Sequence, residues 1–322
     1  MATPLADLTV VICCYTEERW SDILASVRSV QLQTHPPRQI VVVVDHNDRL
    51  LALLKASLPG VEVLPNVKQR GLAGARNSGI AASSGAVVAF LDDDATAERN
   101  WTRALLRHYT DPCVLGVGGA VQPRWVHGRP AWFPNEFDWV VGCSYTGQPS
   151  GTAPVRNLIG ANMSLRRKVF EAVGGFPYAL GRVGKHPAGC EETELCIRAS
   201  RAFPNCKLVY EPEALVAHRV PRARARWSYF RHRCVAEGVS KAIVTQLAGA
   251  RLGLASERAY VRHILPQGIS QGIRAGAAGD VFGLARAAMI VLGLCATVVG
   301  YMQGRASLLL QPTRLGGPGQ HE

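Results

Sequence analysis

The sequence predicts an α/β fold in which a mainly parallel central sheet is flanked by helices and followed by a basic helical extension. Apolar, β-branched runs alternate with helical segments over the first part of the chain. The 322 residues are 48% hydrophobic and 19% charged, which suits a large folded domain with an appendage. Of the net charge of +12, residues 1–218 carry +2 and residues 219–322 carry +10. We therefore expect one domain at 1–220 and a basic extension at 221–322.

The first elements follow from hydrophobic periodicity. Leu8–Cys14 is a short apolar run typical of a buried strand. Glu17–Gln33 has apolar side chains at helical spacing, and Thr16 before two glutamates is a typical helix start. The same alternation then repeats. We expect further strands at Gln39–Val44, Val61–Leu64 and Ala86–Leu91, and helices at Arg49–Ser57 and Leu72–Ser83.

Acidic residues follow two of these strands. Asp45 comes directly after the second strand, and Asp92–Asp94 follow the strand that ends at Leu91. Helical crossovers between strands indicate parallel neighbours, and ligands of such sheets bind at the carboxyl ends of the strands. We therefore expect these aspartates to lie on one rim of the sheet.

The middle of the chain continues the alternation less regularly. Pro123–Pro154 is irregular and rich in aromatic residues, which fit either a core or a substrate platform. The later elements are shorter. We expect strands at Asn157–Leu165, Leu208–Tyr210 and Leu215–Ala217, with His218 ending the last of them, and helices at Arg166–Val173 and Cys190–Arg201.

The basic extension has two notable segments. Arginines alternate with aromatic residues over Arg222–Arg233, and Ala287–Gly304 contains 18 residues without a charge. The second segment is long enough for a short membrane span, a helix lying in the membrane interface or a buried helix of a soluble fold. The chain has no zinc-finger spacing, RNA-binding aromatic signature or heptads, so nucleic acid is not an expected partner. Anionic lipid headgroups or a phosphorylated substrate fit the charge better.

We expect a cytoplasmic protein, either free or held at the cytoplasmic face of the membrane. The first apolar stretch carries Asp7 and runs straight into a strand-like segment, unlike a secretory signal. Nine cysteines cannot all pair, and no CxxC pair is present, which favours small buried thiols in a reducing compartment.

The three consecutive aspartates are the sharpest chemical signal. Asp92, Asp93 and Asp94 would repel one another at a strand end unless a cation lies among them. In an extended chain Asp92 and Asp94 point to the same side. Carboxylates are typical ligands of Mg²⁺ and Mn²⁺, so we expect one of these ions here. A solvated acidic turn is the alternative.

Three weaker signals accompany the aspartates. Small residues of the segment Arg70–Gly79 allow close approach to a ligand, and Arg76 is suited to grip phosphate. Glu191, Glu192 and Glu194 are close enough to raise the pKa of one carboxyl group, as a general base requires, although acidic residues also stabilise helix N-termini. His218 ends a strand and gains meaning only if it meets the aspartates.

In this order, the motifs resemble glycosyltransferase family 2, which has the GT-A fold. The resemblance covers roughly residues 8–220. It rests on a set of motifs spread along the chain: Cys14-Tyr15-Thr16-Glu17, Asp45, the Arg76-Asn77 string, FLDDD at Phe90–Asp94, GANMS at Gly160–Ser164, EETEL at Glu191–Leu195 and AHR at Ala217–Arg219. The whole chain is most similar to bacterial members described as polyprenyl-type glucuronosyl- or glucosyltransferases.

The resemblance implies a site for a nucleotide-diphosphate sugar, with UDP as the expected nucleotide. Residues near the base, ribose, diphosphate or sugar would be Tyr15, Thr16, Glu17, Asp45, Arg76, Asp92, Asp93 and Asn162. The ligands of Mn²⁺ or Mg²⁺ would be Asp92, Asp94 and His218. Glu192 matches the catalytic base of the family. The reaction implied is a single inverting displacement onto a hydroxyl of a glycan or of a polyprenyl-phosphate-linked acceptor.

Two departures from the family pattern leave alternatives open. His46-Asn47 follows Asp45 where the family usually has another acidic residue. The family usually has Asp after Glu at the base, whereas here Glu192 follows Glu191, so either glutamate could act. A nucleotidylyltransferase would carry a glycine-rich basic loop after the first strand, which is missing here. A sugar-nucleotide-binding protein that has lost catalysis is the remaining alternative.

Overall fold

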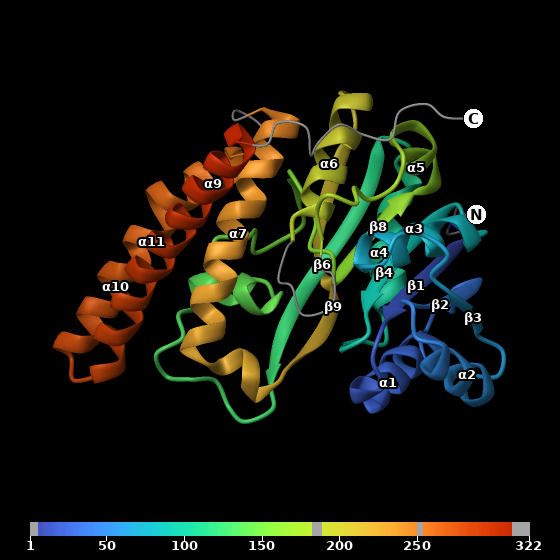
Figure 1. The fold of residues 1–322 in the computed structure, drawn as a ribbon, viewed down its shortest axis with the longest axis horizontal. Helices are drawn as coiled ribbons and strands as arrows, with labels where there is room; N and C mark the ends of the chain where they lie inside the picture. The colour runs from blue at the N-terminus through green and yellow to red at the C-terminus, as the bar shows by residue number, and fades with distance from the viewer. Residues whose placement is uncertain (1–5, 182–188, 250–253, 311–322) are drawn as a thin grey trace.

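A computed structural model describes residues 6–181, 189–249 and 254–310. Its centre is a nine-stranded sheet. Eight of the strands follow the order β3-β2-β1-β4-β8-β6-β9-β5, and the ninth, β7, pairs with β9. Helices cover the sheet, and the C-terminal helices stand to one side of it (Figure 1).

The N-terminal strands confirm the expected parallel arrangement. They are β1 (Leu8–Cys14), β2 (Gln39–Val44), β3 (Glu62–Pro65) and β4 (Val87–Asp92), and β1 pairs in parallel with both β2 and β4. The helices between them are α1 (Trp20–Gln31), α2 (Asp48–Ser57) and α3 (Leu72–Ala82), and a short 3-10 helix, η1 (Glu17–Arg19), precedes α1. Helical crossovers thus place the carboxyl ends of these strands on one rim.

The remaining strands make the sheet mixed. They are β5 (Ala95–Ala97), β6 (Val114–Trp125), β7 (Ala153–Val155), β8 (Asn162–Arg166) and β9 (Lys207–Val220). The strand β8 runs antiparallel to β4 and β6, whereas β6 and β9 are parallel. The remaining helices of this half are α4 (Trp101–Leu106), η2 (Arg107–Thr110), α5 (Arg167–Val173) and α6 (Glu191–Ala202).

Two strand predictions were wrong in extent. The two short strands expected around residue 212 form one strand, β9, because the charged Glu211 between them is fully buried and paired with His108 and Arg107. The strand β8 begins at Asn162 and not at Asn157, and β6 lies in a segment where no strand is expected from the sequence.

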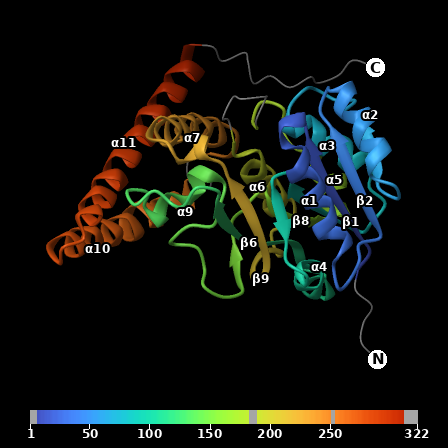
Figure 2. The same ribbon diagram turned by 90° about the horizontal axis from the view of Figure 1, so that it is seen from below.

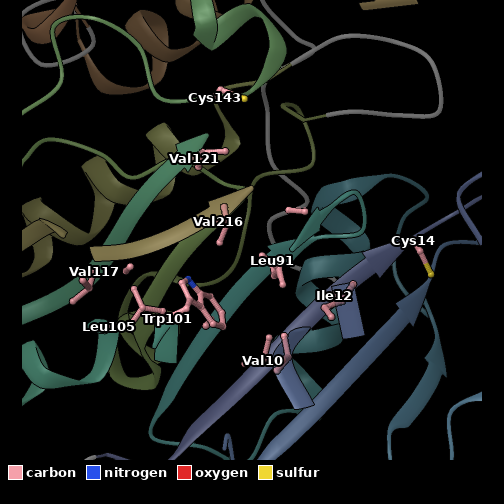
Figure 3. Packing of buried hydrophobic residues seen from close by; sticks show 14 of the residues in the cluster. Val10, Ile12, Cys14, Leu91, Trp101, Leu105, Val117, Val121, Cys143 and Val216 are labelled. Carbon is pink, nitrogen blue, oxygen red and sulfur yellow. The ribbon is translucent and has the colours of Figure 1, made fainter. Parts of the chain in front are cut away.

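The core packs on both faces of the sheet. Val10, Ile12 and Leu91 lie on one face together with Trp101 from α4 (Figure 3). The aromatic segment belongs to this core as well, because Phe133 and Phe137 are each 1% exposed and contact Phe230 of the C-terminal region. Of the two alternatives for this segment, core packing therefore describes it.

The C-terminal region is helical, as expected. Its elements are η4 (Arg222–Ala225), α7 (Trp227–Ala248), α9 (Ala255–Ala259), the π-helical η5 (Tyr260–Ile264), α10 (Leu265–Ala277) and α11 (Val281–Leu310). Both views place α7 between the sheet and the pair α10–α11 (Figures 1 and 2). The 3-10 helix η3 (Asn135–Val141) packs beneath α7 and α11.

Glycines allow α7 and α11 to touch backbone to backbone. A Cβ atom on Gly238 would lie 2.0 Å from the carbonyl oxygen of Thr297, and one on Gly300 would lie 2.0 Å from that of Val235. No side chain fits in either place. The distance between these two helices is therefore set by main-chain atoms.

The helix α11 is long and apolar enough to cross a membrane, by length and composition. Only 22% of its most apolar window is buried inside the chain, so α11 is not a core helix of the fold. Its exposed apolar side chains include Leu292, Val298 and Met302.

Candidate functional site

Two strands bring three potential metal ligands together. Asp92 is the last residue of β4, Asp94 follows in the turn, and His218 lies on β9. One ligand atom from each of Asp92, Asp94 and His218 lies within 4.8 Å of the others. β5, directly after the turn, pairs with β9 and puts Ala95 opposite His218, which fixes this meeting point. The sequence-predicted ligand set thus comes together.

The donor set fits a divalent cation that prefers oxygen. Two carboxylates and one imidazole are available, and Asp94 and His218 are buried while Asp92 is partly accessible. Mn²⁺ and Mg²⁺ both accept such ligands and retain positions for phosphate oxygens or water. The Nδ1 atom of His218 lies 3.6 Å from the Cys143 sulfur, which leaves Nε2 to face Asp94.

Asp94 is surrounded by positive or polarisable groups. Its Oδ1 lies 3.0 Å from Nε2 of His218, and its Oδ2 lies 3.2 Å from Nη2 of Arg224. Burial raises the pKa of this carboxyl group, but the charges of His218 and Arg224, with a smaller contribution from Arg19, hold it well below its usual value. Asp94 is therefore ionised and available as a ligand.

Asp93 points to a different partner. Its Oδ1 forms an ion pair with Arg19, which also lies 3.3 Å from Asp94 Oδ2. Burial raises the pKa of Asp93 to about 7 despite the Arg19 charge, and Oδ2 of Asp93 is buried without a hydrogen-bond partner. Asp93 and Asp94 lie in the turn after β4 and share Arg19 as a partner, so the alternation expected for an extended chain ends at Asp92, although Asp92 and Asp94 both reach His218.

Arg76 links the aspartates to the acidic helix. It is 3% exposed, and its guanidinium donates to Glu191 at 3.0 Å, to Asp92 at 3.3 Å and to the Gly160 carbonyl at 3.0 Å. That Arg76 also lies near the diphosphate stays a prediction. However, these donors are directed at protein acceptors and hold Asp92 and Glu191 in place.

Glu191 and Glu192 have different surroundings at the start of α6. Glu191 is buried and paired with Arg76, whereas Glu192 is half-buried and has no ion pair among the described residues. Burial raises the pKa of Glu192 to about 8, and the neighbouring charge of Glu191 adds to this effect. Of the two glutamates, Glu192 is therefore the one with a carboxylate free to exchange a proton.

A cleft lies beside the aspartates at the carboxyl end of the parallel strands. Tyr15, Arg19, Asp45, Asp92 and Asp93 line it. Tyr15 is 37% exposed, and the Arg19 guanidinium stacks over its ring at 5.6 Å. This is the rim on which the strand order places Asp45 and the aspartates together.

Of the other residues expected near the nucleotide, Asp45 lines the cleft, whereas Thr16 and Glu17 follow Tyr15 in the chain and are not among the lining residues. Asp45 accepts from Asn66 Nδ2 at 2.7 Å and from the Gly71 amide at 3.0 Å, which fixes the chain before α3. Thr16 caps η1 by accepting from the Glu18 amide at 3.3 Å. The carboxylate of Glu17 accepts from Asn47 at 3.1 Å.

The expectation for Asn162 was wrong. This side chain is 0% exposed, and it donates to the carbonyls of Ala120 and Ala214 at 2.9 and 2.7 Å and accepts from Trp101 at 2.7 Å. All of its hydrogen-bonding capacity toward the sheet is used internally. Asn162 therefore joins strands β8, β6 and β9 and does not line a sugar site.

Two arginines at the site were missed by the sequence analysis. Arg19 follows the first strand, and Arg224 lies in the basic segment that was interpreted as a membrane contact. Arg224 and Arg233 are each 7% exposed and cannot face lipid, whereas Arg222, Arg226 and Arg231 are exposed. The position of Arg224 only six residues after His218 was the available signal.

Comparisons with known proteins agree with this geometry. Residues 9–174 match the family described as Glycosyl transferase family 2. The chain is 34% identical over 244 residues to the glucosyl-dolichyl phosphate glucuronosyltransferase of Haloferax volcanii, covering 74% of this chain and 78% of the relative.

Two solved structures share the fold. The mannosyltransferase PcManGT of Pyrobaculum calidifontis, in complex with GDP-Man and Mn²⁺, superposes with a TM-score of 0.60 at 18% identity over 93% of this chain and 88% of that one. GalNAc-T7 with UDP, GalNAc and Mn²⁺ gives a TM-score of 0.52 at 20% identity, over 73% of this chain and 48% of that one. At these identities the likeness concerns the fold.

Proposed function

The chain belongs to glycosyltransferase family 2 and has the GT-A fold, and from this premise we propose that it is an inverting, metal-dependent enzyme acting on a nucleotide-diphosphate sugar. UDP is the proposed nucleotide. The acceptor is a hydroxyl of a glycan or of a polyprenyl-phosphate-linked molecule. The observation that carries this proposal is the convergence of Asp92, Asp94 and His218 beside the cleft, with Arg76 joining Asp92 to Glu191, the residue before Glu192.

Asp92, Asp94 and His218 would hold Mn²⁺ or Mg²⁺. Such an ion supplies positive charge that offsets the negative charge developing on the leaving diphosphate. Arg19 and Arg224 both add fixed positive charge at Oδ2 of Asp94. Arg76 keeps Asp92 oriented through its 3.3 Å contact and keeps Glu191 neutralised through its 3.0 Å contact.

Glu192 is the proposed general base. It would take the proton from the acceptor hydroxyl while the hydroxyl oxygen attacks the anomeric carbon from the face opposite the diphosphate. A single displacement inverts the anomeric configuration and needs no nucleophilic side chain. General-base assistance of this kind contributes about 10²–10⁴-fold in rate. The half-buried position and raised pKa of Glu192 support this role, and the Arg76 pair of Glu191 argues against Glu191.

We also propose that the C-terminal region holds the enzyme at the cytoplasmic face of a membrane. Exposed apolar side chains of α11 and exposed arginines of the same region support this proposal. Anionic headgroups attract the arginines, and the acyl chains beneath them bury the apolar side chains. The Haloferax relative is named for a dolichyl phosphate substrate. A polyprenyl-phosphate-linked acceptor would likewise be anionic at its head and apolar in its tail.

The proposal is tested with purified full-length protein, Mn²⁺, a panel of UDP-sugars and GDP-mannose, and free or polyprenyl-linked glycan acceptors. We expect transfer with inverted product configuration, determined by NMR, and loss of turnover in Glu192→Gln with donor binding retained. A product that keeps the donor configuration, or near-normal turnover in Glu192→Gln, contradicts the mechanism. Binding without turnover would indicate a sugar-nucleotide-binding protein, and pyrophosphate-dependent turnover would indicate a nucleotidylyltransferase.

A further inference from the structure

The helix α7 contacts the turn that leads into the helix carrying Glu192. The Gly189 amide donates to Ser240 Oγ at 3.3 Å, and the Cys190 thiol donates to Glu237 Oε1 at 3.2 Å. Ser240 and Glu237 both belong to α7, whereas Gly189 and Cys190 directly precede α6. The C-terminal region therefore holds the entrance to the catalytic helix.

The backbone of this turn is held in an unfavourable conformation. Cys190 has φ = 71°, in the left-handed region, and is one of two described residues other than glycine with a positive φ. A residue with a Cβ atom adopts this region only when its surroundings hold it there, and such residues cluster at functional sites. Cys190 is 4% exposed, and its side chain is directed at Glu237.

Glu237 is itself fixed by neighbouring charges. Lys241 Nζ lies 3.4 Å from Glu237 Oε1, and Arg233 Nη2 lies 3.8 Å from Oε2. Lys241 continues to Glu257 at 2.7 Å, and Glu257 is paired with Arg156, also at 2.7 Å. This half-buried chain of alternating charges connects α7 with α9 and with the segment before β8.

We propose that Glu237 is a positioning residue for Glu192, holding the left-handed turn at Cys190 and placing a fixed negative charge near the base. The proposal rests on the function proposed above, in which Glu192 is the general base. The charged groups that act on the pKa of Glu192 come from three elements: Glu191 from α6, Arg76 from α3 and Glu237 from α7. Burial and Glu191 raise the pKa of Glu192, Arg76 lowers it, and Glu237 raises it further. α7 would thus tune the base as well as support it.

The substitution Glu237→Gln distinguishes the effect of the Glu237 charge on the pKa of Glu192 from the hydrogen bond that holds the turn at Cys190. Glutamine keeps an oxygen that accepts from Cys190 but carries no charge. We expect the acidic limb of the kcat profile to move to lower pH by about half a unit or more, with a similar plateau. Glu171→Gln is the matched control, because Glu171 is exposed on α5, which also packs against α6. It should leave the limb where it is in the wild type.

The support is tested by Cys190→Ala, which removes the thiol donor and leaves the Glu237 charge. We expect the plateau of kcat to fall about 10-fold without a shift of the limb, while donor affinity measured by calorimetry with Mn²⁺ is unchanged. A limb in Glu237→Gln that lies less than about half a pH unit below that of the Glu171→Gln control overturns the proposal. If Glu192→Gln keeps its turnover, the assignment of the base fails first, so the two failures are told apart.

Discussion

Arg224 Nη2 lies 3.2 Å from Oδ2 of Asp94, although Arg224 belongs to the basic C-terminal region and Asp94 to the end of a central strand. The same guanidinium places Nη1 3.5 Å from Nε2 of His218. The C-terminal region therefore contributes a cation directly to the candidate metal group. A boundary at residue 220 divides the sequence by composition, but the site is built from both sides of it.

Replacing Arg224 tests this contact. Arg224→Ala leaves the buried Asp94 carboxylate with less compensation, and removing one partner of a buried pair costs about 3 kcal/mol. We expect the free energy of unfolding of the metal-free protein to fall by about this amount in urea titrations. Mn²⁺ should restore part of the loss, because it supplies positive charge at the same carboxylate. Arg222→Ala, which changes an exposed arginine of the same segment, should have no measurable effect.

Removal of the metal should abolish transfer and lower thermal stability together. A ligand that binds only the folded protein stabilises it by about 2.7 kcal/mol at a concentration 100 times its dissociation constant. We expect Mn²⁺ to raise the melting temperature of the chelated protein, and His218→Ala to reduce that increase. Full activity after exhaustive chelation would exclude a role for Asp92, Asp94 and His218 as metal ligands.

The pH dependence of turnover should follow Glu192. Its pKa is raised to about 8, so the protonated form dominates below this pH and the deprotonated base dominates above it. We expect kcat to rise about tenfold per pH unit below the limb and to level off above it. Measurements of kcat at saturating donor and acceptor concentrations, from about pH 5.5 to about pH 9.5, would check the limb because they extend to both sides of the pKa of Glu192. A profile that is flat across this range is incompatible with Glu192 as the base.

Asn162 should matter for stability and not for the donor. Asn162→Ala leaves the carbonyls of Ala120 and Ala214 and the Trp101 indole N–H without their partner. Buried groups left unpaired cost about 1–3 kcal/mol each at most, so a marked drop in the free energy of unfolding is expected. The KM for the sugar nucleotide should stay near the wild-type value, and a KM effect without destabilisation would return Asn162 to the site.

Membrane binding should depend on the apolar face of α11. Val298 and Met302 are 52% and 64% exposed, so Val298→Asp and Met302→Asp place charges on that face without disturbing the core. We expect the wild-type chain to sediment with anionic vesicles, less so at high salt, and both variants to remain in the supernatant. Val67→Asp, at an exposed site outside the C-terminal region, is the control. Failure of the wild-type chain to bind anionic vesicles would remove the membrane proposal.

The buried parallel strands could be predicted because their sequences are continuous apolar runs bounded by turns. Leu8–Cys14 and Gln39–Val44 match the observed strands at both ends. The strand β6 was missed because glycines interrupt its pattern. They are required there, since a Cβ on Gly119 would lie 1.7 Å from the Ala214 carbonyl oxygen. The sequence predicts two short strands in place of β9 because a charged residue, Glu211, lies between them. Its burial is explained only by its ion pairs with Arg107 and His108, which lie far away in the sequence.

The site residues likewise differ in whether their roles follow from the neighbouring sequence or from partners far along the chain. Asp92 and Asp94 could be grouped because both follow the same strand run, whereas His218 was added to them only by the family resemblance, since it lies within β9. The roles of Arg76 and Asn162 depend on partners far along the chain, and spacing carries no signal for them. For Arg224 the local signal is its position six residues after His218. The proposal of Glu192 as the base in preference to Glu191 likewise depends on the ion pair between Arg76 and Glu191.

The glycine contacts between α7 and α11 have a mechanical consequence. Since main-chain atoms meet at Gly238 and Gly300, a side chain at either position would force the two helices apart. The helix α11 carries the exposed apolar surface, and α7 carries the groups that bind the thiol and amide in front of Glu191. The spacing of this helix pair therefore fixes how far the exposed apolar surface lies from the turn before Glu191.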